Sequence, residues 1–295
     1  MNFFKRFGYF ILTNLLVMIT ISIAYNLIVS FFHLDAYAGR TGLLAVWALV
    51  WGMGGAVISL LMSKWMVKRL MGVTVLDPNS QQPQERDLLS VVKRLSQSAG
   101  LEKTPEVGIY DAPEINAFAT GPSRNSALVA VSSGLLRSLN KDQIEGVIGH
   151  ELAHVANGDM VTMTLIQGVV NAFVLFFSRI LAGLIADNIS DRSRGLVRFA
   201  LSIVFDIAFG ILGSIAVAYF SRQREFRADA GGARFAGRQK MISALRALQS
   251  QEGQFAPDNT QVATLKISSR STGVMALFGT HPSLSDRIQR LESGL

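Results

Sequence analysis

Residues 140–158 read NKDQIEGVIGHELAHVANG, and this stretch has the pattern of one amphipathic helix. Asn140 is a favourable N-cap residue, and Gln143 three positions later completes a capping-box pattern. Apolar residues then recur at helical spacing, at Ile144, Val147, Ile148, Leu152 and Val155. Asn157-Gly158 ends or bends the helix.

The pattern HELAH at 150–154 lies inside this predicted helix. Spacing of i, i+4 places His150 and His154 on one face, one turn apart, which suits two nitrogen ligands of one zinc ion. Glu151 lies on the adjacent flank, where it can take a proton from a water that the metal has made more acidic. The alternative is a chance match on a solvated helix face, which the low frequency of histidine in this chain disfavours.

A catalytic zinc site needs a third protein ligand, and the composition limits its type. The chain has no cysteine and only four histidines, so a carboxylate is the expected third ligand. The best candidate is Glu225, in the stretch EFRAD, with Asp229 one helical turn later to receive the N–H of a ligating histidine. The alternative is an exposed charged helix, because arginines interleave with the two acids at positions 222, 224 and 227.

The composition also predicts a membrane protein. The 295 residues are 49% hydrophobic and only 17% charged. Gly8–Phe32 and Thr41–Ser63 carry no charged side chain and are each long enough to span a bilayer, although cleavage of the first run as a signal peptide is the alternative. Basic residues before the first run and after the second predict that both ends of this hairpin are cytoplasmic. We expect His33, in the turn, to have no function.

The formal net charge of +7 sits mostly beside these apolar runs. We therefore read it as a topological signal and expect no binding to nucleic acid. Two further apolar runs, Met160–Ala186 and Leu196–Phe220, either span the membrane or are embedded in it. Both outcomes return the chain to the same side, so His154 and Glu225 can share a site. Arg179, Arg198 and Asp206 are costly in lipid unless paired or near the headgroups.

Between the hairpins the chain turns polar and its pattern predicts a small sheet. Gln84–Ser98 reads as a helix, and Glu106–Tyr110 and Ala127–Ser132 read as strands, with Asn116–Ala119 between them. The fold class is therefore α+β and mostly helical. We divide the chain into a transmembrane hairpin (1–72), the first part of a catalytic domain (73–159), a second apolar hairpin (160–220) and the second part of the domain (221–295).

These motifs together resemble the HtpX branch of the Ste24-like family of membrane zinc metalloproteases. HELAH, NGD, EFRAD and THPSLSDR occur in the family's order, and INAFATG, LVAVSSGLL and NGDMVTMTLIQGVVN extend the similarity over nearly the whole chain. The resemblance implies a gluzincin-type zinc protease domain with a small sheet, fused to transmembrane helices. It also implies one Zn2+ per chain, held by His150, His154 and Glu225, with Glu151 as general base and Asp229 behind a ligand.

The resemblance also implies residues that touch substrate. His281 matches the family's histidine after the catalytic core and is expected to bind substrate or stabilise the oxyanion, assisted by Arg287. By itself it would read as a surface histidine before a proline turn. The segment Ala127–Ser132, with Ala127 and Val129, and as a second candidate Asn116–Ala119, resembles the sheet edge that pairs with an extended substrate strand. The alternative for that segment is an ordinary buried strand, because it is apolar on both faces.

The expected function is cleavage of peptide bonds in misfolded or damaged membrane proteins, as part of quality control under stress. The resemblance implies a multi-pass protein of the bacterial inner membrane, with a cytoplasmic catalytic domain and a functional overlap with an ATP-dependent membrane protease. The rivals are an inactive scaffold that keeps zinc for structure, and a transporter suggested by the charges in the apolar runs. Neither rival explains Glu151 between two histidines. Cleavage preference, substrates, oligomeric state and control of self-cleavage stay open.

Overall fold

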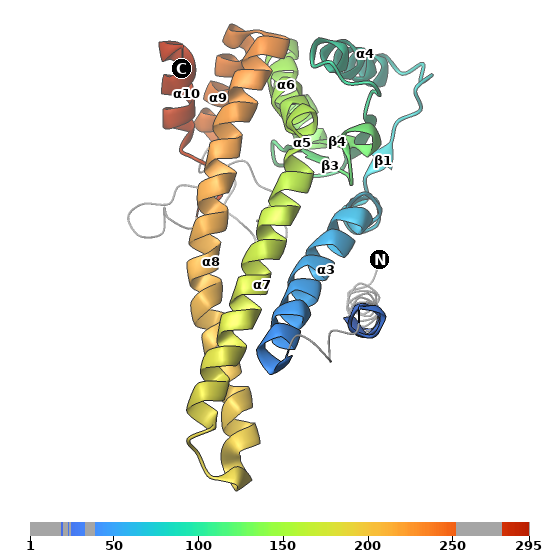
Figure 1. Ribbon diagram of the computed structural model, residues 1–295. Helices are drawn as coiled ribbons and strands as arrows, with labels where there is room; N and C mark the ends of the chain where they lie inside the picture. The colour runs from blue at the N-terminus through green and yellow to red at the C-terminus, as the bar shows by residue number, and fades with distance from the viewer. Residues whose placement is uncertain (1–18, 20–22, 24, 33–38, 252–278, 295) are drawn as a thin grey trace. The chain divides into compact units, whose positions relative to one another are not determined.

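A computed structural model describes residues 39–251 and 279–294, together with 19, 23 and 25–32. The chain forms two compact units (Figure 1). The first combines Met1–Leu60 with Met163–Val217, and the second combines Leu61–Thr162 with Ala218–Leu295. The predicted turn with His33 and the loose stretch 253–264 lie outside the described residues, as does most of the first apolar run. Within that run, residues 25–31 are helical.

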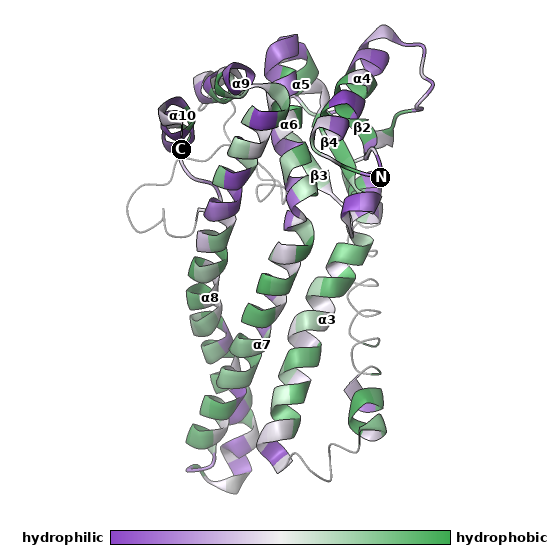
Figure 2. Cartoon of the chain, turned by 45° about the horizontal axis from the view of Figure 1, so that its top comes forward, coloured by the Kyte–Doolittle hydropathy of each residue, from purple (hydrophilic) through white to green (hydrophobic). Residues whose placement is uncertain are grey.

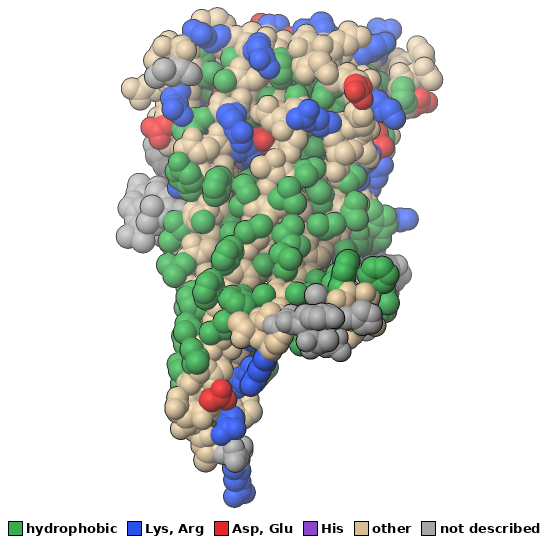
Figure 3. All heavy atoms as spheres, viewed as in Figure 1, with side chains coloured by type: hydrophobic (Ala, Val, Ile, Leu, Met, Phe, Trp, Pro, Cys, Tyr) green, Lys and Arg blue, Asp and Glu red, His purple; other side chains and the backbone are tan. Residues whose placement is uncertain are grey.

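The first unit contains the apolar parts of three long helices, α3 (Gly39–Leu70), α7 (Asp159–Ala186) and α8 (Asp191–Ala236). All three are long and apolar enough to cross a membrane, and only 11%, 17% and 6% of their most apolar windows is buried inside the protein. Figure 2 shows the apolar residues along these helices, and Figure 3 shows apolar side chains gathered on the surface of α7 and α8. Such exposure is costly in water and is expected in lipid.

Two of the three charged residues in the apolar runs, Arg179 and Asp206, pair inside this unit. The Arg179 guanidinium lies 2.9 and 3.0 Å from the two carboxylate oxygens of Asp206. It also lies over the ring of Trp47, 5.7 Å from the centroid. Side chains from α3, α7 and α8 therefore satisfy the two charges, which lowers the cost of placing them in lipid. The pairing gives the transporter alternative no support.

The second unit is built on a four-stranded sheet of order β1-β2-β4-β3. Its strands are β1 (Thr74–Val75), β2 (Glu106–Tyr110), β3 (Ala117–Thr120) and β4 (Leu128–Ser132). β2 and β4 are parallel, whereas β1 pairs antiparallel with β2 and β3 pairs antiparallel with β4. β4 is the central strand and all of its residues are buried, which explains its apolar composition on both faces.

Helices cover both faces of this sheet. Apolar residues of α4 (Pro83–Ser98) and α6 (Lys141–Asn157) form one core with β2, β3 and β4 that includes Val92, Val129 and Leu152. On the other face, Phe118 and Leu128 belong to a cluster. Val67, in the last turn of α3, and Met71, just after that helix, pack against it. The short helix α5 (Ser133–Ser138) follows β4. This core fixes α6, and hence its histidines, on the sheet.

The last elements, α9 (Arg238–Gln251) and α10 (Leu284–Ser293), pack on each other through Met241, Leu245 and Ile288. The predicted elements near the sheet are confirmed to within a residue or two. α3 and α8 are longer than the apolar runs that predicted them. A helix does not end where its side chains become charged, because lysine and arginine are good helix formers, and α3 ends only before Gly72, whose φ is 69°.

The packing of α3 on α7 depends on a glycine, which gives a test of the first unit. A Cβ atom added at Gly52 would lie 2.4 Å from the backbone nitrogen of Ala172, whereas one added at Gly55 meets nothing within 4 Å. We expect Gly52→Ala to lower the free energy of unfolding by about 1–3 kcal/mol through overpacking. Gly55→Ala, in the same helix, should leave it unchanged or raise it, since alanine favours helix. SDS titration of the detergent-purified protein, followed by tryptophan fluorescence, compares the two, and equal stability of both variants would contradict this packing.

Candidate metal centre

Helix α6 carries the HELAH stretch, and its two ends are formed by the residues that the sequence predicted. The Asn140 side chain accepts a hydrogen bond from the Gln143 amide, and the Gln143 side chain accepts one from the Asn140 amide, so the capping box is present. The helix ends at Gly158, whose φ of 70° is left-handed. His150, Glu151 and His154 are all buried, with 5–8% of their surface exposed.

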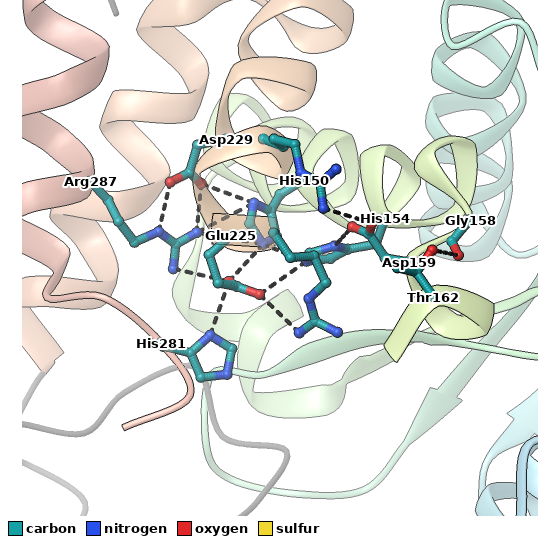
Figure 4. A network of polar contacts seen from close by, with 11 residues as sticks. His150, His154, Gly158, Asp159, Thr162, Glu225, Asp229, His281 and Arg287 are labelled. Atoms are coloured by element: carbon teal, nitrogen blue, oxygen red, sulfur yellow. Dashed lines mark hydrogen bonds and ion pairs between the residues drawn. The ribbon is translucent and has the colours of Figure 1, made fainter. Parts of the chain in front are cut away.

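Helix α8 supplies the acidic residues, and small residues allow it to lie close to α6. A Cβ atom at Gly232 would lie 2.9 Å from the backbone nitrogen of His150, and one at Gly231 would lie 2.6 Å from the Cβ of Ala153. Larger residues at either position would push the helices apart. The close approach places Glu225 and Asp229, about two turns and one turn earlier on α8, beside the histidine face of α6 (Figure 4).

The two histidines and Glu225 point ligand atoms at one position. The Nε2 atoms of His150 and His154 are 3.2 Å apart, and they lie 3.4 and 3.3 Å from the two carboxylate oxygens of Glu225. A tetrahedral zinc ion with bonds of about 2.0–2.1 Å requires ligand atoms about 3.3–3.4 Å apart. Each of the three spacings is close to this value, with one carboxylate oxygen near each histidine. One ligand atom from each of the three residues lies within 4.8 Å of the others, so they form a potential metal-binding group.

A carboxylate lies behind each of the two histidines (Figure 4). His150 Nδ1 is 3.0 Å from Asp229 Oδ1, and His154 Nδ1 is 2.7 Å from Asp159 Oδ2. Both carboxylates therefore lie within hydrogen-bonding distance of a histidine Nδ1 atom. Arg287 completes the arrangement by donating to both oxygens of Asp229, at 2.6 and 2.8 Å.

The electrostatics of the cluster favour a bound cation. Burial by itself would lower the pKa of His150, but its contacts with Asp229 and Glu225 raise that pKa to about 9. Glu225 lies past the apolar part of α8. Burial alone would raise the pKa of its carboxyl group. The contacts with His150, His154 and His281 nevertheless hold this pKa well below the usual range. An environment that holds a proton on an imidazole this strongly also suits a divalent ion in its place.

Glu151 is buried next to the candidate ligands, and its side chain differs from theirs in its polar contacts. Within the described part of the chain, its carboxylate takes no hydrogen bond and no ion pair. The carboxylates of Glu225, Asp229 and Asp159, by contrast, are all engaged. Among the described residues, Glu151 is therefore the one acidic group of the cluster whose carboxylate has no hydrogen-bond or ion-pair partner.

His281 and Arg287 come from the last segment and reach the same cluster. His281 Nδ1 lies 2.9 Å from Glu225 Oε2, and its side chain is 19% exposed. Arg287 is 1% exposed and Nη1 lies 3.8 Å from the same oxygen. Because its Nε and Nη2 atoms bind Asp229, the visible role of Arg287 is to support that carboxylate.

The predicted substrate edge needs a correction. Ala127 and Val129 are 3% and 0% exposed, and Val129 lies in β4, which already pairs with β2 on one side and β3 on the other. The carbonyl of Ala127 accepts the Glu106 amide. A strand added from outside cannot pair with these backbones. The backbone groups of Asn116 cannot pair with a substrate strand either, because both its N–H and its carbonyl already bond to Ser132. The edge strands of the sheet are β1 and β3.

Two residues near the ligands were missed from the sequence. Asp159 had no assigned role, although NGD was part of the resemblance, because its contact with His154 crosses a helix break. Arg224 was read only as one of several interleaved arginines, but its Nη2 lies 3.0 Å from Glu225 Oε1. Adjacency to Glu225 in the sequence was the available signal.

Comparison with known proteins agrees with this geometry. The sequence profile of peptidase family M48 matches residues 82–294. The chain belongs to peptidase family M48. M48 relatives match over the full length: "Protease HtpX homolog" of Bacillus licheniformis is 49% identical over 98% of this chain and 99% of its own. "Protease HtpX" of Tolumonas auensis is 49% identical over 97% and 98%.

The fold of this M48 chain is also similar to a solved structure. The crystal structure of S. mikatae Ste24p superposes with a TM-score of 0.59 at 16% identity, covering 95% of this chain and 65% of that one. At this identity the likeness concerns the fold alone. The protein is thus an HtpX-type M48 membrane metalloprotease, and the predicted fold class and enzyme class are confirmed.

The buried Arg287–Asp229 pair gives a test of how this centre is held together. Arg287→Ala leaves the Asp229 carboxylate buried without its cation, which typically costs about 3–5 kcal/mol. Arg287→Lys should not restore stability, since an ammonium cannot reproduce two parallel bonds. Arg290→Ala on the same helix, which loses only a stacking contact with Phe226 at 4.1 Å, should cost about 0.5–1 kcal/mol. Chemical unfolding of the three purified variants measures the difference, and equal losses at Arg287 and Arg290 would refute it.

Proposed function

We propose that this protein is a zinc endopeptidase that cleaves membrane proteins, with one zinc ion held by His150, His154 and Glu225 and with Glu151 as the catalytic base. One observation carries the proposal. Two imidazole nitrogens and a carboxylate from two helices converge, with N–N and N–O spacings of 3.2–3.4 Å, and the Glu151 carboxylate beside them has no competing partner among the described residues. A purely structural zinc site would not need that free acid, which argues against an inactive scaffold.

The residues divide the chemistry between them. Zinc supplies Lewis acidity, which polarises a carbonyl and makes water more acidic. Glu151 accepts the proton of the attacking water and later donates it to the leaving amine, so the base is regenerated in each cycle. His281 binds the substrate carbonyl or stabilises the oxyanion, from its partly exposed position beside Glu225.

The substrate strand is proposed to pair with β3. Asn116 and Ser132 form a hydrogen-bonded pair, and such pairs alternate along an antiparallel ladder. Phe118 and Thr120 therefore bond to β4, whereas the N–H and C=O groups of Ala117 and Ala119 face the free edge. An extended peptide can add there with little dependence on its side chains, because backbone groups make the bonds.

The substrates are proposed to be misfolded or damaged membrane proteins and their cytoplasmic loops. The support is the membrane-type surface of α3, α7 and α8 and the basic residues Lys64, Lys68 and Arg69 at the end of α3, which favour a cytoplasmic location for that end. We place the protein in the bacterial inner membrane, in contact with the lipid bilayer. It would act in quality control under stress, overlapping with an ATP-dependent membrane protease, and would bind no nucleic acid.

The first test separates metal binding from catalysis. Glu151→Gln should bind zinc with unchanged affinity but lose proteolysis by at least about a hundredfold, since the general base is removed. Glu225→Ala should lose zinc. Cleavage of an unfolded membrane-protein substrate by detergent-purified protein, with zinc restored after chelation, measures activity, and chelator competition measures affinity.

Glu145→Gln is the matched control for this test, because it makes the same change on the same helix at a residue whose ion pairs, among the described residues, are with Arg94 and Lys240. It should cleave like the wild type. If Glu151→Gln cleaves like the wild type, the assigned base is wrong, and if Glu225→Ala keeps its zinc, the third ligand is another residue.

The β3 edge is tested by removing one outward N–H. Ala119→Pro deletes a donor that faces the free edge and leaves the bonds to β4 in place, and proline is tolerated at such positions. Loss of one backbone hydrogen bond worth about 1–1.5 kcal/mol predicts a five- to tenfold lower kcat/KM for an extended peptide. Ala119→Val keeps the N–H and should behave like the wild type. Full activity of the proline variant would exclude substrate pairing at this residue.

A further inference from the structure

Asp159 is a buried acid with no role in the catalytic scheme above. It is 2% exposed, and Oδ2 lies 2.7 Å from Nδ1 of His154. This is the shortest contact that either histidine makes in the described part of the chain. The position corresponds to that of Asp229 behind His150, so the two histidines have one carboxylate each.

The chain reaches this arrangement through a tight connection between two helices. His154 lies in the last turn of α6, Gly158 follows in a left-handed conformation with φ of 70°, and α7 begins at Asp159. A residue with a side chain rarely adopts this φ. The left-handed turn redirects the chain at once, so that the first residue of α7 faces the last turn of α6.

The environment keeps the Asp159 carboxylate available to His154. Asp159 stands in the first turn of α7, where the free N–H groups of a helix stabilise negative charge. Its nearest cation, Arg227, lies 3.9 Å away and is 63% exposed, so it neutralises little of that charge. Asp229 differs, because a buried guanidinium takes both of its oxygens.

We propose that Asp159 is a positioning residue of the metal centre, which holds His154 in the tautomer and orientation that present Nε2 to zinc, and that the Gly158 turn serves to place it there. A carboxylate hydrogen-bonded to Nδ1 also increases the electron density at Nε2, which strengthens that ligand. The helix that continues into the apolar segment 160–186 thus begins at a residue that determines metal affinity. This inference rests on the proposed zinc site.

The experiment measures zinc affinity of the full-length, detergent-purified protein by chelator competition, for Asp159→Ala and Asp159→Asn. Loss of such a partner typically lowers metal affinity by about 10–100-fold, and we expect this for Asp159→Ala. Asp159→Asn should lose less, because an amide oxygen still accepts the Nδ1 proton but lacks the charge. The visible absorption spectrum of the Co2+-loaded protein should shift in both variants, which a change in stability alone would not cause.

Asp142→Ala is the matched control. Asp142 is also an acid in the first turn of a helix, α6, but it is exposed and contacts only Lys240. It should keep wild-type zinc affinity and the wild-type Co2+ spectrum. If Asp159→Ala does not fold, Asp159→Asn, which has nearly the same volume, answers the question.

Two results would overturn the inference in different ways. Wild-type affinity and an unshifted Co2+ spectrum in both Asp159 variants, with zinc lost in His150→Ala, would refute the role of Asp159 alone. Zinc binding that His150→Ala leaves unchanged would refute the metal site itself, and the role of Asp159 with it.

Discussion

The close contact between α6 and the end of α8 is the constraint on which the rest of the site depends. α6 provides both histidines but no third ligand, and α8 provides Glu225 and Asp229 but no histidine. Only backbones that approach as closely as they do at Gly232 and His150 allow a short glutamate side chain to reach both imidazoles. The sheet holds α6 from one side through Leu152 and Val129, so α8 is the element whose position decides the geometry of the metal centre.

This contact brings several charged groups together in a buried site. Pairing these groups with one another offsets the free-energy cost of removing their charges from water. Three of the acids in the cluster each receive a proton donor from an imidazole or guanidinium. The apolar unit follows the same rule, where Arg179 and Asp206 offset each other under Trp47. Buried charges in proteins are tolerated when they are paired and hydrogen-bonded. Glu151 departs from this pattern, and an unpaired acid next to the ligand atoms is a feature typical of a catalytic group.

Much of the fold was readable from the sequence because its signals are local. The capping residues of α6, the apolar periodicity of α4 and the length of the apolar runs depend on neighbouring residues only. The i, i+4 pairs in HELAH and EFRAD likewise predicted which side chains share a face, and the structure brings those faces together. Their roles as ligands, base and support remain predictions from geometry and family.

The errors concern relations that no local pattern records. Val129 was placed at a substrate edge because a short apolar strand looks the same at the centre of a sheet as at its border. The order β1-β2-β4-β3, in which the chain passes through the edge strand before the central one, is set by long-range pairing. Asp159 was missed for a related reason, since its contact with His154 depends on a left-handed glycine that breaks the helical period.

The separation of the ligands along the chain has a consequence for biosynthesis. His150 and His154 are translated before the apolar segment 160–220, and Glu225 is translated after it. Both arms of that segment are therefore synthesised before the proposed third ligand exists. A nascent or truncated chain that ends within the segment holds two histidines and no complete centre. The order of synthesis itself delays assembly of a potentially self-destructive enzyme until its membrane helices have been made.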